Sequence, residues 1–284
     1  MSAGEHAVFQ GRTEKKTGSI TPVQAAQLHA TLGDSDRPAP GPGEDMPPLW
    51  HWCAFNPTTP LAGLARDGHP VPGGFLPPVR LARRMWASGS LRFLAPLRVG
   101  EALRQQSRLA RVEEKDGRTG PMVLITVEHE VSGARGVAIE EVQNIVYLDI
   151  PESFAPPPKK SMPGSPSLSE TRMLSEALLF RYSALTFNAH RIHYDLPYAR
   201  EVEHYPGLVV HGPLQATWLM EMACRARGRC PSAFEFRAVH PMLLAGGRAA
   251  QVMAEEGEAG ALRLITGQDG HQCTQATARW EETA

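Results

Sequence analysis

The densest group of side chains able to do acid–base chemistry lies in one short stretch, residues 182–195. Eight consecutive residues of it hold an amide, two imidazoles, a guanidinium and a carboxylate, from Asn188, His190, Arg191, His193 and Asp195. An imidazole titrates near neutral pH, so it can take a proton from water or give one to carbon. Histidines taken alone are more often structural hydrogen-bond partners, so the spacing leaves both interpretations open.

A predicted helix begins close behind this stretch, at Gly212. A proline follows Gly212, apolar residues recur every four positions, and Gly228 stands where the helix would end. The first N–H groups of a helix lack partners within it and lie at the positive end of its dipole. The Gly212 N–H could therefore stabilise an oxygen that gains negative charge, although an ordinary helix start explains the same residues.

Residues 182–195 resemble the hydratase motif of the MaoC-like enzymes, which have the hot-dog fold. Aligned on its last histidine, the motif reads Leu185-Thr186-Phe187-Asn188-Ala189-His190-Arg191-Ile192-His193. It is most similar to the branch spelled S-A-L-T-F-N-A-H-x-I-H-Y-D. That branch contains mitochondrial-type 3-hydroxyacyl-thioester dehydratases and mesaconyl-C4-CoA (3-methylfumaryl-CoA) hydratases. Residues 208–215 also resemble the start of the family's central helix, so the resemblance implies a hydro-lyase that acts on enoyl-CoA thioesters.

The resemblance also implies catalytic roles. His193 is expected to be the base or acid, and the N–H of Gly212 to polarise the thioester carbonyl. The general family has an aspartate where this chain has Asn188. An amide cannot accept a proton, so Asn188 is expected to orient water only. The second proton carrier is left open between His190, His193 acting alone with the bound water, and His211.

Five residues are expected to contact the substrate: Tyr182, Arg191, His211, Trp52 and Arg83. A guanidinium suits both a CoA phosphate and a substrate carboxylate, so either Arg83 or its neighbour Arg84 could meet one. A solvated surface pair is the alternative for the two arginines, and packing in the core is the alternative for the aromatic residues around Trp52. Asp195 is expected to orient a histidine or to cap a turn.

Other site chemistries are disfavoured. A metal site built from His190 and His193 with His204 and His211 lacks a cysteine or carboxylate cluster at recognisable spacing, so no metal is expected. Ser183 lacks the G-x-S-x-G context of a nucleophile. No cofactor is expected, because coenzyme A is part of the substrate.

The elements that must position these residues fall into two parts. Residues 151–167 are rich in proline and predict a linker between a domain at 1–150 and a domain at 168–284. Each part combines a predicted helix with alternating segments typical of antiparallel strands. The first helix, at 21–32, is expected to begin with a capping box formed by Thr21 and Gln24, and the second spans 212–228. One of these predicted strands is Ala177–Ser183. The element order predicts an α+β duplication, which the resemblance identifies as a double hot-dog.

The strand predictions rest on period-2 runs bounded by glycine and proline. They are 89–93, 102–112, 122–131 and 143–148 in the first part, and 177–183, 234–240, 249–254, 263–267 and 274–280 in the second. Residues 47–52, 73–78 and 83–86 resemble the N-terminal, dehydratase-like domain of the two-domain hydratases. That resemblance implies a first domain without catalytic residues that shapes the acyl pocket.

Composition narrows the partners. The 284-residue chain carries a net charge of −1, which disfavours nucleic acid and anionic membranes. It has no apolar run long enough for a membrane span, and its N-terminus lacks the apolar core of a secretory signal, so a cytoplasmic protein is expected. The four cysteines are irregularly spaced, and reduced thiols are the simpler expectation.

The expected function is reversible hydration of mesaconyl-C4-CoA to citramalyl-CoA. Dehydration of a 3-hydroxyacyl-CoA or -ACP in fatty-acid metabolism is the close alternative. A non-catalytic acyl-thioester-binding module is an alternative of another class, and Asn188 is its best support. A thioesterase shares the scaffold but lacks this Asn–His signature. Edge strands of such sheets often pair between subunits, so a homodimer is expected.

Overall fold

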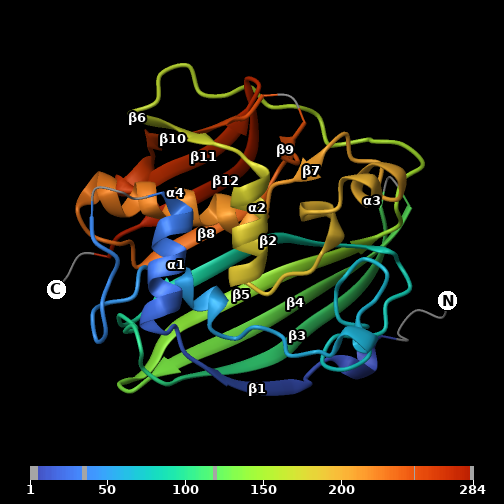
Figure 1. The fold of residues 1–284 in the computed structure, drawn as a ribbon, viewed down its shortest axis with the longest axis horizontal. Helices are drawn as coiled ribbons and strands as arrows, with labels where there is room; N and C mark the ends of the chain where they lie inside the picture. The colour runs from blue at the N-terminus through green and yellow to red at the C-terminus, as the bar shows by residue number, and fades with distance from the viewer. Residues whose placement is uncertain (1–5, 34–36, 118–119, 246, 282–284) are drawn as a thin grey trace.

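The computed structural model describes residues 6–33, 37–117, 120–245 and 247–281 (Figure 1). Its strands are β1 (Thr13–Gly18), β2 (Arg83–Phe93), β3 (Leu103–Gly117), β4 (Gly120–Gly133), β5 (Gly136–Leu148), β6 (Leu168–Met173), β7 (Leu208–Val209), β8 (Ala233–Ala238), β9 (Leu243–Leu244), β10 (Ala249–Glu256), β11 (Leu262–Gln268) and β12 (His271–Arg279). Its α-helices are α1 (Pro22–Leu32), α2 (Glu176–Leu185), α3 (Leu196–Glu201) and α4 (Gly212–Arg227). Its 3₁₀ turns are η1 (Ala7–Phe9), η2 (Trp50–Cys53), η3 (Leu61–Gly63), η4 (Arg191–His193) and η5 (Glu258–Gly260).

Ten of these strands form one antiparallel sheet, in the order β1-β3-β4-β5-β2-β8-β12-β11-β10-β6. The first five strands belong to residues 1–150, here called the first half, and the other five to residues 168–284, the second half. Numbered within its own half, each set has the order 1-3-4-5-2. The duplication that the element order predicted is therefore present in the sheet topology.

The two halves meet where β2 pairs with β8, from Ser88 opposite Arg237 to Arg92 opposite Ala233. Gly89 lies opposite Phe236 in this seam, and a Cβ at Gly89 would come within 2.7 Å of the phenylalanine ring. The missing side chain thus lets Phe236 pack flat across the seam. Because the seam is part of the sheet ladder, the two halves share backbone hydrogen bonds as well as a hydrophobic core.

Helix α4 packs along β8, β10, β11 and β12 of the second half (Figure 1). Nine of its 16 residues are buried, and Gly228 ends it in a left-handed conformation with φ of 65°. The predicted helix and its stop are therefore confirmed. Gln215 lies on its buried face and accepts hydrogen bonds from Thr266 Oγ1 (2.7 Å) and Thr274 Oγ1 (3.0 Å), which satisfies its buried amide oxygen.

Helix α1 has the predicted capping box, in which Thr21 Oγ1 accepts from Gln24 N–H and Gln24 Oε1 accepts from Thr21 N–H. It packs against α2 of the second half, beside which it lies in Figure 1. The expectation of one long helix on each sheet is therefore met in the second half, whereas the first half places a shorter helix of 11 residues at the contact between the halves.

The predicted strand at Ala177–Ser183 is wrong, because this segment lies in helix α2. Ser175 caps the helix by accepting a hydrogen bond from Leu178 N–H at 3.1 Å, and Glu176 stands in its first turn. The strand that opens the second half is β6, a few residues earlier. Residues 151–167 run as an irregular segment along the second half, with hydrogen bonds to Gly270 and Ala254. The division into two domains at this segment stays a prediction.

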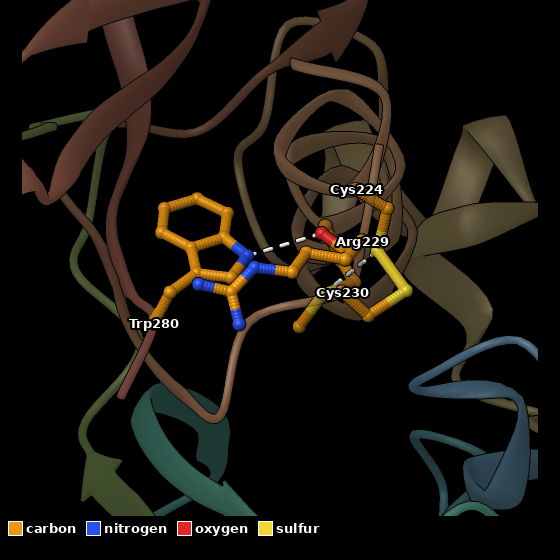
Figure 2. Close-up of a disulfide and its surroundings, with 5 residues drawn as sticks. Cys224, Arg229, Cys230 and Trp280 are labelled. Carbon is orange, nitrogen blue, oxygen red and sulfur yellow. Dashed lines mark hydrogen bonds between the residues drawn. A yellow bond between two sulfur atoms is a disulfide. The ribbon is translucent and has the colours of Figure 1, made fainter. Parts of the chain in front are cut away.

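The expectation of reduced thiols is wrong for one pair of cysteines. Cys224 and Cys230 form a disulfide at the end of α4 (Figure 2). The left-handed turn at Gly228 brings the chain back toward the helix, which leaves the two Cα atoms 4.2 Å apart. Cys53 and Cys273 are free and buried. Of the described residues, no helix is both long and apolar enough to span a membrane.

Candidate active site

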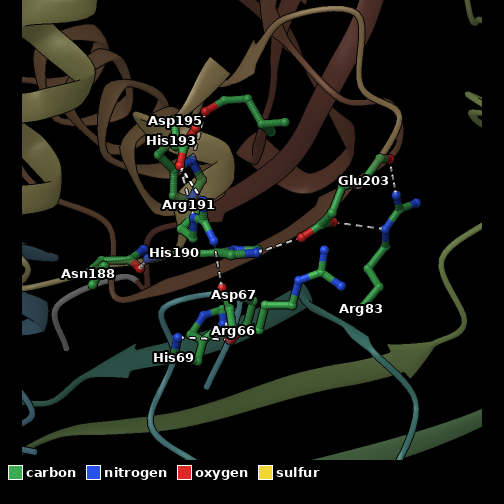
Figure 3. A network of polar contacts seen from close by, with 12 residues as sticks. Arg66, Asp67, His69, Arg83, Asn188, His190, Arg191, His193, Asp195 and Glu203 are labelled. Atoms are coloured by element: carbon green, nitrogen blue, oxygen red, sulfur yellow. Dashed lines mark hydrogen bonds and ion pairs between the residues drawn. The ribbon is translucent and has the colours of Figure 1, made fainter. Parts of the chain in front are cut away.

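The site lies where the segment from α2 to α4 meets a loop of the first half, residues 65–70 (Figure 3). Helix α2 ends at Leu185, and Phe187 follows it with a positive φ of 49°. That conformation turns the chain toward η4, which carries His193, and Asp195 then caps α3 by accepting from Tyr198 N–H at 3.1 Å. The prediction that Asp195 caps a turn is confirmed, and the motif residues are held between two short helices.

His193 is buried and has one fixed tautomer. Its Nδ1 lies 2.7 Å from the carbonyl oxygen of Val209, which can only accept, so Nδ1 carries the hydrogen and Nε2 keeps its lone pair. The pairing of β7 with β9 holds Val209 in place. Burial, reinforced by the neighbouring histidines His211 and His190, keeps the pKa of His193 well below its usual value of 6.5. The imidazole is therefore neutral at physiological pH and can act as a base through Nε2.

His211 stacks on His193, with ring centroids 3.6 Å apart and planes inclined by 19°. Its Nε2 is hydrogen-bonded to Ser183 Oγ at 2.8 Å. The rings of Tyr182 and His211 pack edge to face, with centroids 5.0 Å apart. Burial lowers the pKa of His211 to about 3, so this ring is neutral as well. His211, Ser183 and Tyr182 together form a neutral wall behind His193. Burial likewise raises the pKa of Tyr182 well above 10, so its phenol stays protonated.

His190 is linked to the first half through Glu203. His190 Nε2 lies 3.1 Å from Glu203 Oε1, and Arg83 Nε of β2 lies 3.2 Å from Glu203 Oε2. Arg83 also donates to the backbone oxygen of Glu203 at 2.6 Å and stacks over the ring of Tyr205 at 4.7 Å. Arg83 thus binds a carboxylate that is 1% exposed, and that carboxylate fixes the orientation of His190 (Figure 3).

The loop at residues 65–70 brings a second histidine to His190. The rings of His69 and His190 have centroids 4.3 Å apart, and His69 Nδ1 is hydrogen-bonded to Asp67 Oδ2 at 2.8 Å. Gly68, with φ of +91°, lies so close to Ala189 that a Cβ would overlap its carbonyl oxygen. Burial lowers the pKa of His69 to about 4, although the hydrogen bond to Asp67 acts to raise it. Burial would raise the pKa of Asp67, but its hydrogen bonds to His69 lower it to about 2. The approach of Gly68 to Ala189 is thus a contact between the first half and the motif that only a glycine permits.

Donor atoms of Asp67, His69 and His190 lie within 4.8 Å of one another, a spacing that could hold a metal ion. Each of the three already has a hydrogen-bond partner, since Asp67 pairs with His69 and His190 pairs with Glu203. Over the described part of the chain this is the one group that meets the spacing, and it contains neither His193, His204 nor His211. The alternative metal site of the sequence analysis is thus not assembled.

Asn188 closes the turn that carries His190. Its Oδ1 accepts the His190 N–H at 3.0 Å, and its own N–H donates to the carbonyl oxygen of Ser183 at 2.8 Å. The side-chain NH₂ has no partner among the described residues. A water molecule in the site could accept from it, which agrees with the orienting role predicted for Asn188.

Gly212 is the first residue of α4, with His211 at the cap position before it. An added Cβ would meet nothing within 4 Å, and no acceptor for its N–H lies among the described residues. The unpaired N–H at the helix N-terminus and the open space beside the Gly212 Cα fit the expected oxygen-binding role. Because His211 stacks on His193, this N–H and the base are positioned by the same helix end.

Like Arg83, which binds Glu203, two further expected substrate contacts have partners within the protein. The guanidinium of Arg191 donates to Asp195 Oδ2 from Nε (2.9 Å) and Nη2 (2.7 Å) and covers the ring of Tyr198. The indole N–H of Trp52 donates to Glu141 Oε1 at 2.9 Å, and its ring packs edge-on against Trp86 with centroids 4.9 Å apart. Arg191 therefore stabilises the motif loop, and Trp52 belongs to an aromatic cluster at the seam between the halves, where Phe236 of β8 packs against it with ring centroids 5.9 Å apart.

Sequence reasoning missed Glu203, Asp67 and His69. Glu203 follows α3 and lies between two other polar residues, Glu201 and His204. Nothing in that pattern distinguishes Glu203 from its neighbours. The signal for the loop was Asp67-Gly68-His69, a glycine between two residues able to hydrogen-bond each other. Its importance depends on a contact with a residue far along the chain, which spacing does not reveal.

Comparison with known proteins adds independent information. The family model of hydroxyacyl-thioester dehydratase type 2 matches residues 49–244. The mesaconyl-C(4)-CoA hydratase of Chloroflexus aurantiacus is 43% identical over 246 residues, which cover 85% of this chain and 86% of that protein. The mitochondrial hydroxyacyl-thioester dehydratase type 2 of Schizosaccharomyces pombe is 28% identical over 224 residues, covering 70% of this chain and 69% of that protein.

Solved structures show the same fold at low sequence identity. A MaoC-like dehydratase from Phytophthora capsici has a TM-score of 0.70 at 14% identity, and the match covers 97% of each chain. A Mycobacterium tuberculosis protein described as having a double hot-dog fold has a TM-score of 0.61 at 13% identity, with 95% of each chain covered. The predicted α+β double hot-dog is confirmed by these neighbours and by the repeated strand order.

Proposed function

Because this chain belongs to the hydroxyacyl-thioester dehydratase type 2 family and is a hydro-lyase, we propose that it reversibly hydrates mesaconyl-C4-CoA to citramalyl-CoA. The 43% identity over 85% of the chain to a hydratase of that name carries the proposal. The fixed tautomer of His193 supports it, because hydration of a conjugated thioester requires a base for water. Coenzyme A enters as part of the substrate, and the proposed reaction needs no further cofactor.

In the proposed mechanism, Nε2 of His193 removes a proton from a water molecule oriented by Asn188. The water oxygen bonds to the β-carbon of the acyl group, and the double-bond electrons move toward the thioester oxygen. The Gly212 N–H stabilises the resulting enolate at the helix N-terminus. The enolate then takes a proton at its α-carbon, which yields the 3-hydroxyacyl thioester. Dehydration follows the same path in reverse.

We place both proton transfers on His193. His211, a candidate for the second carrier, is 1% exposed: its Nε2 is held by Ser183, and its Nδ1 is buried away from solvent. His190 has its Nε2 held by Glu203, and Asn188 cannot carry a proton. The imidazolium formed in the first step is thus the nearest acid for the α-carbon, and its low pKa favours rapid release of the proton.

One assay tests the proposed function. The protein is incubated with mesaconyl-C4-CoA and, separately, with crotonyl-CoA, and both the absorbance of the conjugated thioester and the release of free thiol are followed. We expect rapid loss of absorbance with mesaconyl-C4-CoA and no thiol release. Activity with crotonyl-CoA alone would instead favour the fatty-acid dehydratases, to which the 28% identical relative belongs. Thiol release would indicate a thioesterase, and no change with either substrate would indicate a binding module.

We further propose that the protein is a cytoplasmic homodimer that binds neither nucleic acid nor membrane. The strands β1 and β6 end the sheet and have a free edge within the described chain, which supports pairing with a second copy. Light scattering of the purified protein distinguishes a dimer from a monomer of 31.0 kDa.

A further inference from the structure

A cavity of about 240 Å³ lies between the two halves, next to the loop that carries His69. Its walls come from this loop and from the ends of β2 and β5 in the first half, and from Tyr198 and Val202 in the second. Ligand pockets for drug-sized molecules span about 300–1,000 Å³, so this cavity suits a small acyl group and not a nucleotide. No step of the mechanism above uses it.

Two polar groups of the cavity lie directly opposite each other on neighbouring strands. Arg84 of β2 pairs in register with Tyr147 of β5, and both line the cavity. Side chains opposite each other on one face of an antiparallel pair are close neighbours. Burial raises the pKa of Tyr147, and the charge of Arg84 acts in the opposite direction. Burial lowers the pKa of His69, and the charge of Arg84 lowers it further. The guanidinium of Arg84 therefore lies near both side chains.

Tyr147 has a hydroxyl group without a partner. The residue is 2% exposed, and its hydroxyl is buried with no hydrogen bond in the described structure. A buried hydroxyl without a partner costs free energy, so native structures seldom leave one unless a ligand or ion satisfies it. Tyr147 is one of the residues that line the cavity, so an acceptor bound there is a candidate partner for its hydroxyl.

The lining of the cavity carries more positive than negative charge. Arg66, Arg80 and Arg84 line it, and none of them forms an ion pair with a described residue. The single carboxylate in the lining is Asp67, and both of its oxygens are hydrogen-bonded to His69, one to the ring and one to the backbone N–H. The arginines and the phenol therefore offer donors to an anion from outside the protein.

The position of the cavity decides which part of the substrate it would face. His69 lines it, the ring of His69 contacts that of His190 at 4.3 Å, and the ring of His190 contacts that of His193 at 5.5 Å. The contact of His69 with His190 and that of His190 with His193 thus connect the cavity wall to the base. In a CoA thioester the long pantetheine arm separates the phosphates from the reacting carbons. In a mesaconyl-C4 group, by contrast, the free carboxylate is bonded to the carbon that takes up water.

We propose that Arg84 and the Tyr147 hydroxyl bind the free carboxylate of a dicarboxylic acyl group and so select monothioesters of dicarboxylic acids. This inference rests on the proposed function and names the residues that would give it specificity. The guanidinium donates to one or both carboxylate oxygens, the phenol donates to one of them, and the apolar walls at Val79, Leu81 and Val202 accommodate the methyl branch. A fatty acyl chain would leave the guanidinium and the phenol without an acceptor.

The test compares two unreactive ligands that differ only at this group. In 3-methylsuccinyl-CoA a carboxylate stands where isovaleryl-CoA has a methyl group, and the dissociation constant of each is measured by calorimetry. We expect Arg84→Met to weaken binding of 3-methylsuccinyl-CoA by about tenfold or more and to leave isovaleryl-CoA within about twofold, as loss of a charge-assisted hydrogen bond predicts. Tyr147→Phe should give a smaller loss for 3-methylsuccinyl-CoA alone. Arg84→Lys keeps the positive charge and should retain part of the affinity for 3-methylsuccinyl-CoA that Arg84→Met loses.

Arg92→Met is the matched control, since Arg92 lies on the same strand and pairs with Glu140 on the surface. Equal weakening of both ligands by Arg84→Met would mean that Arg84 binds the phosphates of CoA, and no change with either would mean that it binds neither. Both outcomes overturn the inference. Hydration of mesaconyl-C4-CoA by the unaltered protein is measured alongside. If hydration is absent while the ligand preference persists, the proposed function fails and the carboxylate site stands.

Discussion

The two halves carry equivalent sheets but use their buried histidines differently. In the first half, His51 Nε2 lies 3.1 Å from Glu141 Oε2, and both side chains are almost completely buried. In the second half, His193 bonds a backbone carbonyl through Nδ1 and stacks on a neutral histidine. Each partner holds one ring nitrogen: Glu141 holds Nε2 of His51 and leaves its Nδ1 buried without a partner, whereas the Val209 carbonyl holds Nδ1 of His193 and leaves Nε2 with its lone pair. The two histidines thus differ in which ring nitrogen is held and in the charge of the partner that holds it.

The largest effect is expected from His193→Ala, which removes the base. Hydration of mesaconyl-C4-CoA should fall by at least about 10²–10⁴-fold, the usual contribution of general acid–base catalysis, with the fold retained. In contrast, His51→Ala should lower the free energy of unfolding by about 3–5 kcal/mol, because it leaves Glu141 buried without its histidine partner, while the folded fraction keeps its turnover number. Steady-state kinetics and urea unfolding separate the two. Near-full activity of His193→Ala would refute the catalytic assignment.

A second contrast concerns two glycines. Gly212→Ala should lower kcat by about tenfold or more, because the new Cβ would fill open space beside the N–H and hinder the approach of the thioester oxygen, while stability stays within about 0.5 kcal/mol. Gly68→Ala should instead prevent the loop from approaching Ala189, with loss of stability as well as activity. Melting temperatures and kcat values test the pair. Unchanged kcat in Gly212→Ala would mean that the thioester oxygen binds elsewhere.

Glu203→Gln tests whether the first half orients the catalytic segment. The amide can still accept from His190 but no longer pairs its charge with Arg83, so we expect kcat to fall by about tenfold to a hundredfold through misplacement of the loop. Glu140→Gln is the matched control, because it breaks an exposed pair with Arg92 and should change neither kcat nor stability by a measurable amount. Equal kinetics in both variants would exclude a positioning role for Glu203.

The pH dependence should follow the neutral histidines. The pKa of His193 is well below 6.5, so kcat/KM should stay level from neutral pH to below 6.5 and fall only at more acid values. For the fold, His69 and His211 have pKa values lowered to about 4 and about 3. The unfolded chain therefore takes up protons below about pH 6.5 that the folded chain does not, so stability should decrease as pH falls from 6.5 toward 4. Urea unfolding at pH 7.5 and 5.0 tests the sign, and a flat profile would contradict it.

The smallest effect is expected from Asn188→Asp, which restores the aspartate of the general family. A carboxylate oxygen can accept the His190 N–H as the amide does, so the turn should persist and activity should remain within about tenfold of the original. A large loss would show that the donor NH₂ of Asn188, and not its oxygen, holds the attacking water. Initial rates at saturating substrate make the comparison.

Local signals predicted much of the fold. The capping box at Thr21, the glycine stop at Gly228 and most period-2 segments match elements of the structure. The segment Ala177–Ser183 failed because its alternating bulky residues suit either a strand or a helix lying partly in the core. The cap at Ser175 would have decided between them. Strands β1 and β6 were missed because their polar sequences lie at the sheet edges, where little is buried.

The candidate site was predictable where its residues belong to the two motifs that the resemblance covers, residues 182–195 and 208–215. His193, His190 and Asn188 share one segment, and the resemblance identified them together. Glu203 and His69 act through contacts that depend on the pairing of β2 with β8 and on the approach of Gly68 to Ala189. Spacing along the chain carries no information about such contacts, since many loops of similar composition would be equally compatible with it.

The close contact between Gly68 and Ala189 also bears on how the protein is made. The loop with Gly68 leaves the ribosome long before Ala189 is synthesised, and β2 has no partner on one side until β8 emerges. A nascent chain that ends within residues 151–167 therefore exposes an unpaired strand edge beside a half-formed site, which makes it a target for chaperones or for aggregation. Catalytic competence should consequently arise late, after nearly the whole polypeptide has been released.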